Sequence, residues 1–207
     1  MEKGSLIVVS GFSGAGKGTL MKELLREYDN YVLSVSMTTR DPRPGEEHGR
    51  EYFFVTMEEF VRTVKEEGLL EYATYVGNCY GTPRSYVEEQ LEKGKDVLLE
   101  IEVQGGMQIR RKFPEAVLLF VVTPSAGELK RRLQFRKTET EEQIRKRLER
   151  ALEETAYIRD YDYVIINDDV SRCAKEMDEI IRSAKRMPVR SEPFIAEMEK
   201  DLNDLIG

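Results

Sequence analysis

Short apolar runs alternate with helical patterns along most of the chain. The run LIVV at residues 6–9 is uninterrupted, which is typical of a short strand buried on both faces of a sheet. Further strands are predicted at residues 31–35, 97–103, 117–122 and 163–166. Helices are predicted from about Lys17, from Pro83, from Ser125, over 140–158 and over 170–186. Capping-box spacings occur at Ser125 with Glu128 and at Thr140 with Gln143, and the apolar stripe of the helix at 140–158 is Ile144, Leu148, Ala151, Leu152 and Ile158. This alternation predicts an α/β fold, in which helices cover both faces of a parallel sheet.

Residues 36–85 depart from this pattern. Residues 36–50, SMTTRDPRPGEEHGR, combine prolines, glycines and arginines without an apolar period, which predicts a loop. The predicted elements that follow are a strand at 51–55, a helix with a capping-box spacing at Thr56 and Glu59, a strand at 69–75 and a turn-rich return at 76–82. The segment is therefore predicted to form a small α+β insertion.

Two carboxylates interrupt the predicted strand at 97–103. Glu100 and Glu102 are two residues apart, so in a strand they share one face. A carboxylate inside a buried strand is costly unless it lies at the carboxyl end, where parallel sheets bind ligands. Both are therefore expected at a ligand site.

Residues 188–207 end the chain with an amphipathic pattern. Pro188 and Pro193 precede an apolar period over 194–206. Such a stretch either covers the core or mediates self-association, and packing on the core is the preferred interpretation.

The motif GFSGAGKGTL directly follows the first predicted strand. Gly11, Gly14 and Gly16 allow a tight loop whose amide groups face a phosphate, and Lys17 adds a positive charge at the start of a helix. The usual motif places Ser or Thr directly after the lysine, whereas here Gly18 intervenes before Thr19. An ordinary glycine-rich turn is the alternative, but glycines and lysine together favour a variant phosphate-binding loop for a nucleotide polyphosphate.

Basic residues gather in the helical hairpin predicted at 125–158. They are Arg131, Arg132, Arg136, Lys137, Arg145, Lys146 and Arg147. Charges on a helix usually form a solvated face, but beside a phosphate-binding loop they indicate a second set of phosphate contacts. Two insertions on one nucleotide-binding core suggest two substrates and a phosphoryl transfer, which needs positioning, charge neutralisation and exclusion of water.

Composition narrows the class of protein further. The chain has 207 residues, 40% hydrophobic and 34% charged, which suits one α/β domain with insertions. No stretch approaches the roughly 20 apolar residues that span a bilayer, and the N-terminus has no cleavable signal pattern, so a cytoplasmic protein without membrane contact is expected. The net charge of −7 argues against broad nucleic-acid binding. Two cysteines and one histidine make a disulfide framework or zinc site improbable, which leaves oxygen-bound magnesium as the expected metal.

Several motifs, in order, resemble those of guanylate kinases over about residues 5–187. They are GFSGAGKGTL, SVSMTTRDPRPGE, REYFFV, LLEYATYVGNCYGTP, LLEIEVQG, RKTETEEQIRKRL and VIIND. The resemblance implies transfer of the γ-phosphate of ATP to GMP, and to dGMP, with Mg²⁺. It also implies a P-loop core (1–35, 86–124 and 159–207), a GMP-binding domain (36–85) and a lid (125–158).

The resemblance assigns a GMP site. Its phosphate contacts would be Arg40, Arg43, Tyr52 and Tyr80; its guanine contacts would be Glu71 and Glu102 to N1–H and the amino group, and Ser36 and Thr82 to the O6 side, with Gly81 beside them. Arginine forks match phosphate oxygens, and unpaired buried carboxylates would penalise AMP by up to about 10⁴-fold.

It also assigns an ATP site. Its loop contacts would be Gly11, Phe12, Ser13, Gly14, Ala15, Gly16, Lys17, Gly18 and Thr19. Asn167 would lie beside the adenine, with a plain turn role as the alternative, while Thr19 and Glu100 would lie near magnesium and its waters. Lys17, Arg40, Arg132, Arg136 and Arg147 would stabilise the transferring group.

Two features depart from the family pattern. Arg136-Lys137 replaces the usual Arg-Gly of the lid, and Gly18-Thr19 replaces the serine common in the loop.

A non-catalytic protein-binding module is the main alternative function, but such a module is expected to lose the loop glycines and lysine. A kinase for another nucleoside monophosphate conflicts with Glu71, Ser36 and Thr82, and a P-loop switch or repair-type ATPase would not need the insertion at 36–85. Monomer and homodimer both remain open.

Overall fold

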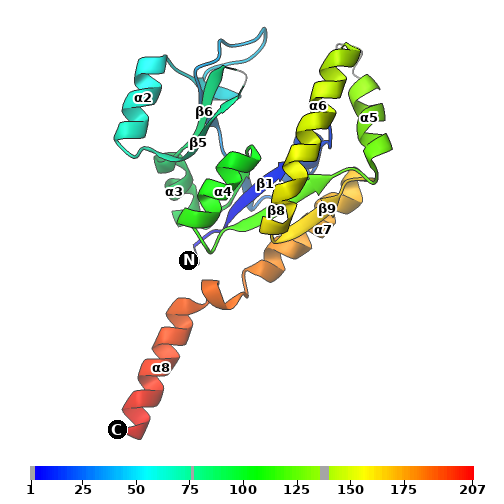
Figure 1. The fold of residues 1–207 in the computed structure, drawn as a ribbon. Helices are drawn as coiled ribbons and strands as arrows, with labels where there is room; N and C mark the ends of the chain where they lie inside the picture. Colours follow the sequence, from blue (N-terminus) through cyan, green and yellow to red (C-terminus); the bar gives the residue numbers. More distant parts are fainter. Residues whose placement is uncertain (1–2, 76, 136–139) are drawn as a thin grey trace.

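The computed structural model describes residues 3–75, 77–135 and 140–207, and within them a five-stranded sheet forms the core (Figure 1). The strands run in the order β2-β7-β1-β8-β9, and every neighbouring pair is parallel. They are β1 (Leu6–Gly11), β2 (Tyr31–Leu33), β7 (Asp96–Glu100), β8 (Val117–Val122) and β9 (Tyr163–Ile166). This confirms the predicted parallel α/β fold.

Helices cover both faces of this sheet. Ile7 and Val9 of β1 belong to one buried cluster with α1 (Lys17–Glu27) and α7 (Val170–Ala184). Leu6 and Val8 point the other way, into a cluster with α3 (Arg84–Glu92) and α4 (Val103–Lys112). The apolar run at residues 6–9 is uninterrupted because alternate side chains of β1 pack against different helix layers, one on each face of the sheet.

A second, mixed sheet is built within the insertion at 36–85. Its strands run in the order β4-β3-β6-β5, and they are β3 (Ser36–Thr38), β4 (Tyr52–Phe54), β5 (Leu69–Tyr75) and β6 (Asn78–Pro83). The strand at 69–75 and the capping box of α2 (Met57–Lys65) are confirmed, because Thr56 and Glu59 bond reciprocally. The loop predicted from residue 36 begins instead with strand β3, and the turn-rich return predicted at 76–82 contains strand β6, so both predictions were wrong there. The two strands pair with each other.

The chain after β7 also differs from the prediction. The strand ends at Glu100, and Glu102 is the N-cap of α4, a helix that the pattern at 97–103 did not reveal. Glu100 and Glu102 therefore do not share a strand face. They lie instead on the turn between a strand end and a helix start.

The helical hairpin consists of α5 (Ala126–Phe135) and α6 (Glu141–Glu154), followed by the 3₁₀ helix η1 (Thr155–Asp160). The predicted cap is confirmed, since Thr140 and Gln143 bond reciprocally. Leu129, Leu133, Ile144 and Ala151 bury the seam of the hairpin against Phe12 of the glycine loop. Leu152 was predicted to face the core but is 73% exposed, while Arg136 and Lys137 lie outside the described residues.

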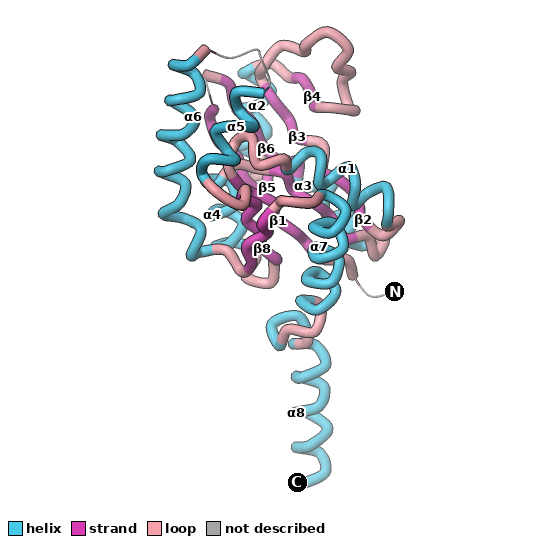
Figure 2. Tube along the Cα trace, turned by 90° about the vertical axis from the view of Figure 1, so that its right-hand side faces the viewer, coloured by secondary structure: helices cyan, strands magenta, loops and turns pink. Residues whose placement is uncertain are grey.

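The C-terminal helix extends away from the rest of the molecule (Figures 1 and 2). The 3₁₀ helix η2 (Pro188–Arg190) is attached to the body, because Arg190 donates to Ser5 Oγ and to the Glu115 carbonyl. None of the residues of α8 (Glu192–Ile206) is buried, so the preferred interpretation that this stretch packs on the core was wrong. None of the described helices is long and apolar enough to cross a membrane.

Candidate active site

The glycine loop connects β1 to α1 at the carboxyl edge of the parallel sheet. Gly11 has a φ of 149°, and a Cβ there would lie 2.1 Å from the Val121 carbonyl oxygen. Gly16 has a φ of 92°, and a Cβ there would lie 2.6 Å from Asn167 Nδ2. Side chains are excluded at both positions, so the loop backbone stays close to its neighbours and its amides remain available to an anion.

Lys17 spans the glycine loop. Its Nζ donates to the Gly11 carbonyl at 2.7 Å and approaches the Phe12 carbonyl at 3.4 Å. The charge is therefore held over the loop, at the N-terminus of α1, where a phosphate oxygen would replace a carbonyl as its acceptor.

A cavity of about 410 Å³ lies between the core sheet and the second sheet. We call it the arginine cavity, and among its lining residues are Lys17, Ser36, Arg40, Arg43, Tyr52, Glu71, Tyr80, Glu100 and Glu102. All of these were predicted as site residues, from segments far apart in the chain. Thr82 lies behind Glu71, and Gly81 lies in β6, opposite Met37 of β3.

Glu46 holds the two arginines of this cavity. Arg40 Nη2 donates to both Glu46 oxygens, at 3.1 and 2.9 Å, and the Arg43 backbone N–H donates to Glu46 Oε2 at 2.8 Å. These contacts, led by the Arg43 amide, lower the pKa of Glu46. The Arg40 guanidinium also lies over the Tyr52 ring, 5.3 Å from its centroid. Sequence reasoning missed Glu46, whose only signal was an acid within an arginine-rich loop.

Glu71 forms the buried wall of the cavity. It is 3% exposed, and Thr82 Oγ1 donates to its Oε1 at 2.6 Å. Burial raises the pKa of Glu71 to about 7, against the opposing hydrogen bond from Thr82. Gly105 of α4 backs this carboxylate, since a Cβ there would lie 2.3 Å from Glu71 Oε2. Gly105 was not predicted, because nothing in the sequence places α4 against β5.

Glu100 and Glu102 also line the cavity. Burial raises the pKa of Glu100, although its carboxylate opens toward solvent in the cavity, and the nearby Lys17 opposes the shift. Glu102 Oε2 lies 3.6 Å from Arg150 Nη2 of α6. The two acids therefore face different cations, one at the glycine loop and one on the helical hairpin.

The residues near Glu100 could bind a magnesium ion only together with phosphate groups and water, because they supply few oxygen ligands. Glu100 Oε2 would lie 3.9 Å from a Cβ on Gly18, next to the exposed Thr19 in the first turn of α1. Within the described residues no group of three His, Cys, Asp or Glu side chains has the arrangement to hold a metal. One carboxylate and one hydroxyl suit Mg²⁺, which is usually bound by few protein oxygens together with phosphates and water.

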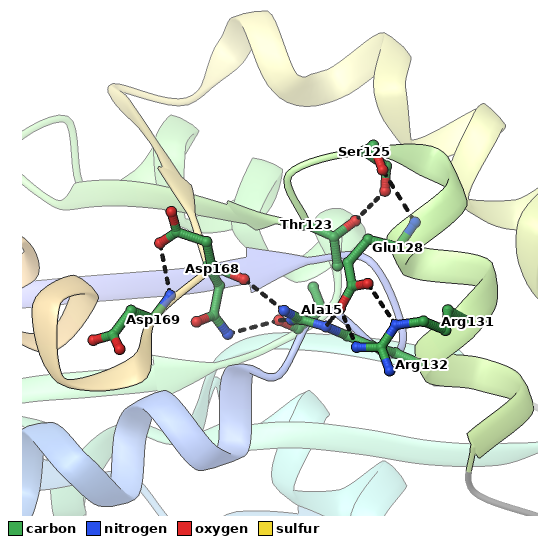
Figure 3. A network of polar contacts seen from close by, with 9 residues as sticks. Ala15, Thr123, Ser125, Glu128, Arg131, Arg132, Asp168 and Asp169 are labelled. Atoms are coloured by element: carbon green, nitrogen blue, oxygen red, sulfur yellow. Dashed lines mark hydrogen bonds and ion pairs between the residues drawn. The ribbon is translucent and has the colours of Figure 1, made fainter.

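Arg132 of α5 is fixed against the glycine loop (Figure 3). Its Nε donates to Glu128 Oε1 at 2.7 Å, its Nη1 to the Ala15 carbonyl at 3.2 Å and its Nη2 to the Asn167 carbonyl at 2.9 Å. Hydrogen bonds from Arg131 and then Arg132 lower the pKa of Glu128 to about 2. Ser125 Oγ accepts from the Glu128 amide, which confirms that half of the predicted capping box.

Asn167 and Arg147 approach the same loop from other elements. The Asn167 side chain is buried and donates through Nδ2 to the Ala15 carbonyl at 2.8 Å. Arg147 of α6 donates to Ser13 Oγ at 2.9 Å. Arg136 lies outside the described residues, so the structure brings Arg132 and Arg147, of the three predicted hairpin arginines, to the loop.

A larger cavity, of about 790 Å³, lies at the far end of α7 and contains none of the predicted site residues. Its Lys185 pairs with Asp96 at 2.7 Å, and its Arg182 lies 3.5 Å from Asp178. The first pair attaches the end of α7 to β7 and the second lies within α7, so both have a structural role, and the chemistry of the molecule is expected at the arginine cavity and the glycine loop.

A phosphate-binding loop at the edge of a parallel sheet, facing a separate arginine-lined cavity, defines a P-loop phosphotransferase with room for a donor and an acceptor. The guanylate kinase family model matches residues 3–184. A guanylate kinase of Clostridioides difficile (strain 630) is 52% identical over 201 residues, which cover 97% of this chain and 98% of that protein. The chain belongs to the guanylate kinase family.

A second relative and a solved structure support the same family assignment. A guanylate kinase of Oceanobacillus iheyensis is 48% identical over 203 residues, which cover 98% of this chain and 97% of that protein. The crystal structure of guanylate kinase from Anaplasma phagocytophilum is similar with a TM-score of 0.74 and 35% identity, over 91% of this chain and 90% of that chain. The similarity thus includes the glycine loop, both sheets and the helical hairpin.

Proposed function

We propose that this protein transfers the γ-phosphoryl group of ATP to GMP, giving ADP and GDP. The observation that carries the proposal is a single cavity that joins Lys17 of the glycine loop to Arg40 and the buried Glu71. A phosphate donor at the loop and a nucleotide acceptor in the cavity would meet there. The γ-phosphoryl group would then pass directly between them.

GMP binds in the arginine cavity. Arg40 exchanges Glu46 for the GMP phosphate, and the Arg43 side chain binds the same phosphate, with Tyr52 and Tyr80 as further donors. Glu71 and Glu102 accept from guanine N1–H and the amino group, and Ser36 and Thr82 lie on the O6 side. AMP lacks those two donors, so it would leave the buried Glu71 carboxylate unpaired, and this cost is the basis of discrimination.

ATP binds at the glycine loop. Lys17 and the loop amides hold its β- and γ-phosphates, while Arg132, Arg136 and Arg147 neutralise charge that develops during transfer. Asn167 supports the loop from below through its bond to Ala15. The division into a core, a GMP-binding domain at 36–85 and a lid at 125–158 supplies the surfaces that exclude water.

Thr19 and Glu100 are the residues that would hold Mg²⁺ with its waters. When bound with ATP, the ion neutralises phosphate charge and orients the phosphates. The protein itself contributes the position of the two oxygens and the positive charge of Lys17.

ADP formation from Mg·ATP tests this function, with GMP, dGMP, AMP, CMP and UMP offered separately. Turnover is expected with GMP and dGMP but not with the other nucleotides. Lys17→Ala is expected to lose nearly all turnover while its unfolding curve stays nearly unchanged, because the lysine side chain bonds only the Gly11 and Phe12 carbonyls of its own loop. Absence of turnover with every nucleotide would instead favour a non-catalytic binding module.

A further inference from the structure

Helix α6 reaches both substrate regions through two arginines one turn apart. Arg147 donates to Ser13 Oγ of the glycine loop at 2.9 Å, and Arg150 Nη2 lies 3.6 Å from Glu102 Oε2. Residues three apart lie side by side on a helix, so one face carries both contacts. Both arginines, together with Ser13 and Glu102, line a cavity of about 250 Å³ between the glycine loop and α6.

Glu154, one turn further along α6, holds Arg150 from the other side. Arg150 Nε donates to Glu154 Oε1 at 3.1 Å. Glu154 is 6% exposed, and within the described residues its Oε2 has no hydrogen-bond partner. Burial and then the charge of Glu102 raise the pKa of Glu154, and Arg150 opposes both effects. The guanidinium therefore lies between two carboxylates that would otherwise repel each other.

Glu102 has little else to fix its side chain. It is the N-cap of α4, yet its side chain makes no capping hydrogen bond. The side chain is also 44% exposed, in contrast to the buried Glu71. An acid in this position has several rotamers open to it, and an ion pair with a fixed arginine selects among them.

We propose that Arg150 is a positioning residue that holds the Glu102 carboxylate toward the guanine and thereby links the lid helix α6 to the GMP site. The inference rests on the proposed function, in which Glu102 accepts from guanine. Glu154 fixes the guanidinium, and the guanidinium fixes Glu102. Since ATP does not contact Glu102, the effect is confined to the acceptor nucleotide.

Arg150→Met tests this inference, because methionine keeps much of the apolar stem without the charge. The KM and the calorimetric Kd for GMP are expected to rise about tenfold, while the KM for ATP changes less than about twofold. Arg26→Met is the matched control, since Arg26 is exposed and pairs with Glu23 and Glu27 of its own helix, α1. That control is expected to leave the KM values for GMP and ATP unchanged.

A double-mutant cycle separates positioning from general damage. In a Glu102→Gln background, Arg150→Met is expected to change the GMP Kd by less than about twofold, because its target is already altered. The combined variant Arg150→Met/Glu154→Gln removes the uncompensated buried acid and keeps the test valid if the single variant unfolds. An unchanged GMP Kd, an equal rise for ATP, or full additivity with Glu102→Gln would each overturn the proposal. Wild-type protein that fails to phosphorylate GMP would instead refute the proposed function.

Discussion

At the scale of single residues, Glu71 combines its proposed contact with guanine with a cost in stability. Its carboxyl is buried, and burial raises its pKa from 4.5 to about 7. A carboxyl with a raised folded-state pKa binds its proton more tightly in the folded than in the unfolded protein. The free energy of unfolding therefore falls as pH rises from about 4.5 to about 7, and the loss is complete above that range.

Glu71→Gln is expected to remove this pH dependence. Glutamine keeps an oxygen for the Thr82 hydroxyl but cannot ionise, so the variant is expected to be more stable than wild type at pH 8, by on the order of 3 kcal/mol. At pH 5 the two proteins are expected to be nearly equal, because wild-type Glu71 is then mostly protonated. Urea unfolding at both pH values measures the difference, with the exposed Glu92→Gln as control. An equal difference at pH 5 and pH 8 would contradict the assigned cause.

At the scale of elements, α4 contributes to the proposed GMP site through its backbone, which packs closely behind Glu71. Its Gly105 lies against Glu71, where a Cβ would come within 2.3 Å of Oε2. The close approach of α4 and β5 therefore depends on the absence of a side chain at Gly105.

Gly105→Ala is expected to raise the KM for GMP about tenfold or more and to leave the KM for ATP nearly unchanged. Alanine favours the helix by about 1 kcal/mol, so the effect comes from displacement of the Glu71 carboxylate and not from loss of α4. Steady-state kinetics with both substrates checks this. Gly127→Ala in α5 is the control, because a Cβ there meets nothing closer than Ser125 Oγ at 3.7 Å. A parallel rise in both KM values for Gly105→Ala would argue against a local effect on Glu71.

At the scale of the whole molecule, the proposed substrate sites and the C-terminal helix α8 lie in different parts of the structure. The second sheet and the α5–α6 hairpin lie at the end of the molecule away from α8, which extends from the body (Figure 1). Phe194, Leu205 and Ile206 of α8 are exposed. Helices of this length are marginal in water by themselves, and α8 adds no buried residue to the core.

Deletion of residues 192–207 is expected to leave the kinetics with GMP and ATP unchanged and to move the thermal unfolding midpoint by less than about 2 °C. The deletion keeps Arg190 and its contacts with Ser5 and Glu115. Differential scanning calorimetry at two protein concentrations measures the shift. A large, concentration-dependent loss of stability would show instead that α8 packs against a second copy.

Local physical rules explain the parts that the sequence predicted well. The glycine loop, the strands at 69–75 and 163–166, and the two capping boxes depend on residues close together in the chain, so their signals are complete within a short window. The residues of the arginine cavity were also predicted, through motifs in a known order. Lys17 and Glu100 meet there because the parallel strands β1 and β7 end at the same edge, whereas most of the other residues come from the second, mixed sheet and its loop.

Only the tertiary structure decided the remainder. Strand β3 pairs with β6 between residues more than 40 positions apart, Met37 with Gly81 and Thr38 with Tyr80, and no local pattern carries that information. Glu46, Gly105 and Arg150 matter through what lies opposite them, namely Arg40, Glu71 and Glu102. Likewise, the amphipathic pattern of α8 predicts a helix but not what it contacts. Sequence alone thus determined the local elements and the chemistry of the site, while the packing of distant segments determined its supporting residues, because such contacts depend on the whole fold.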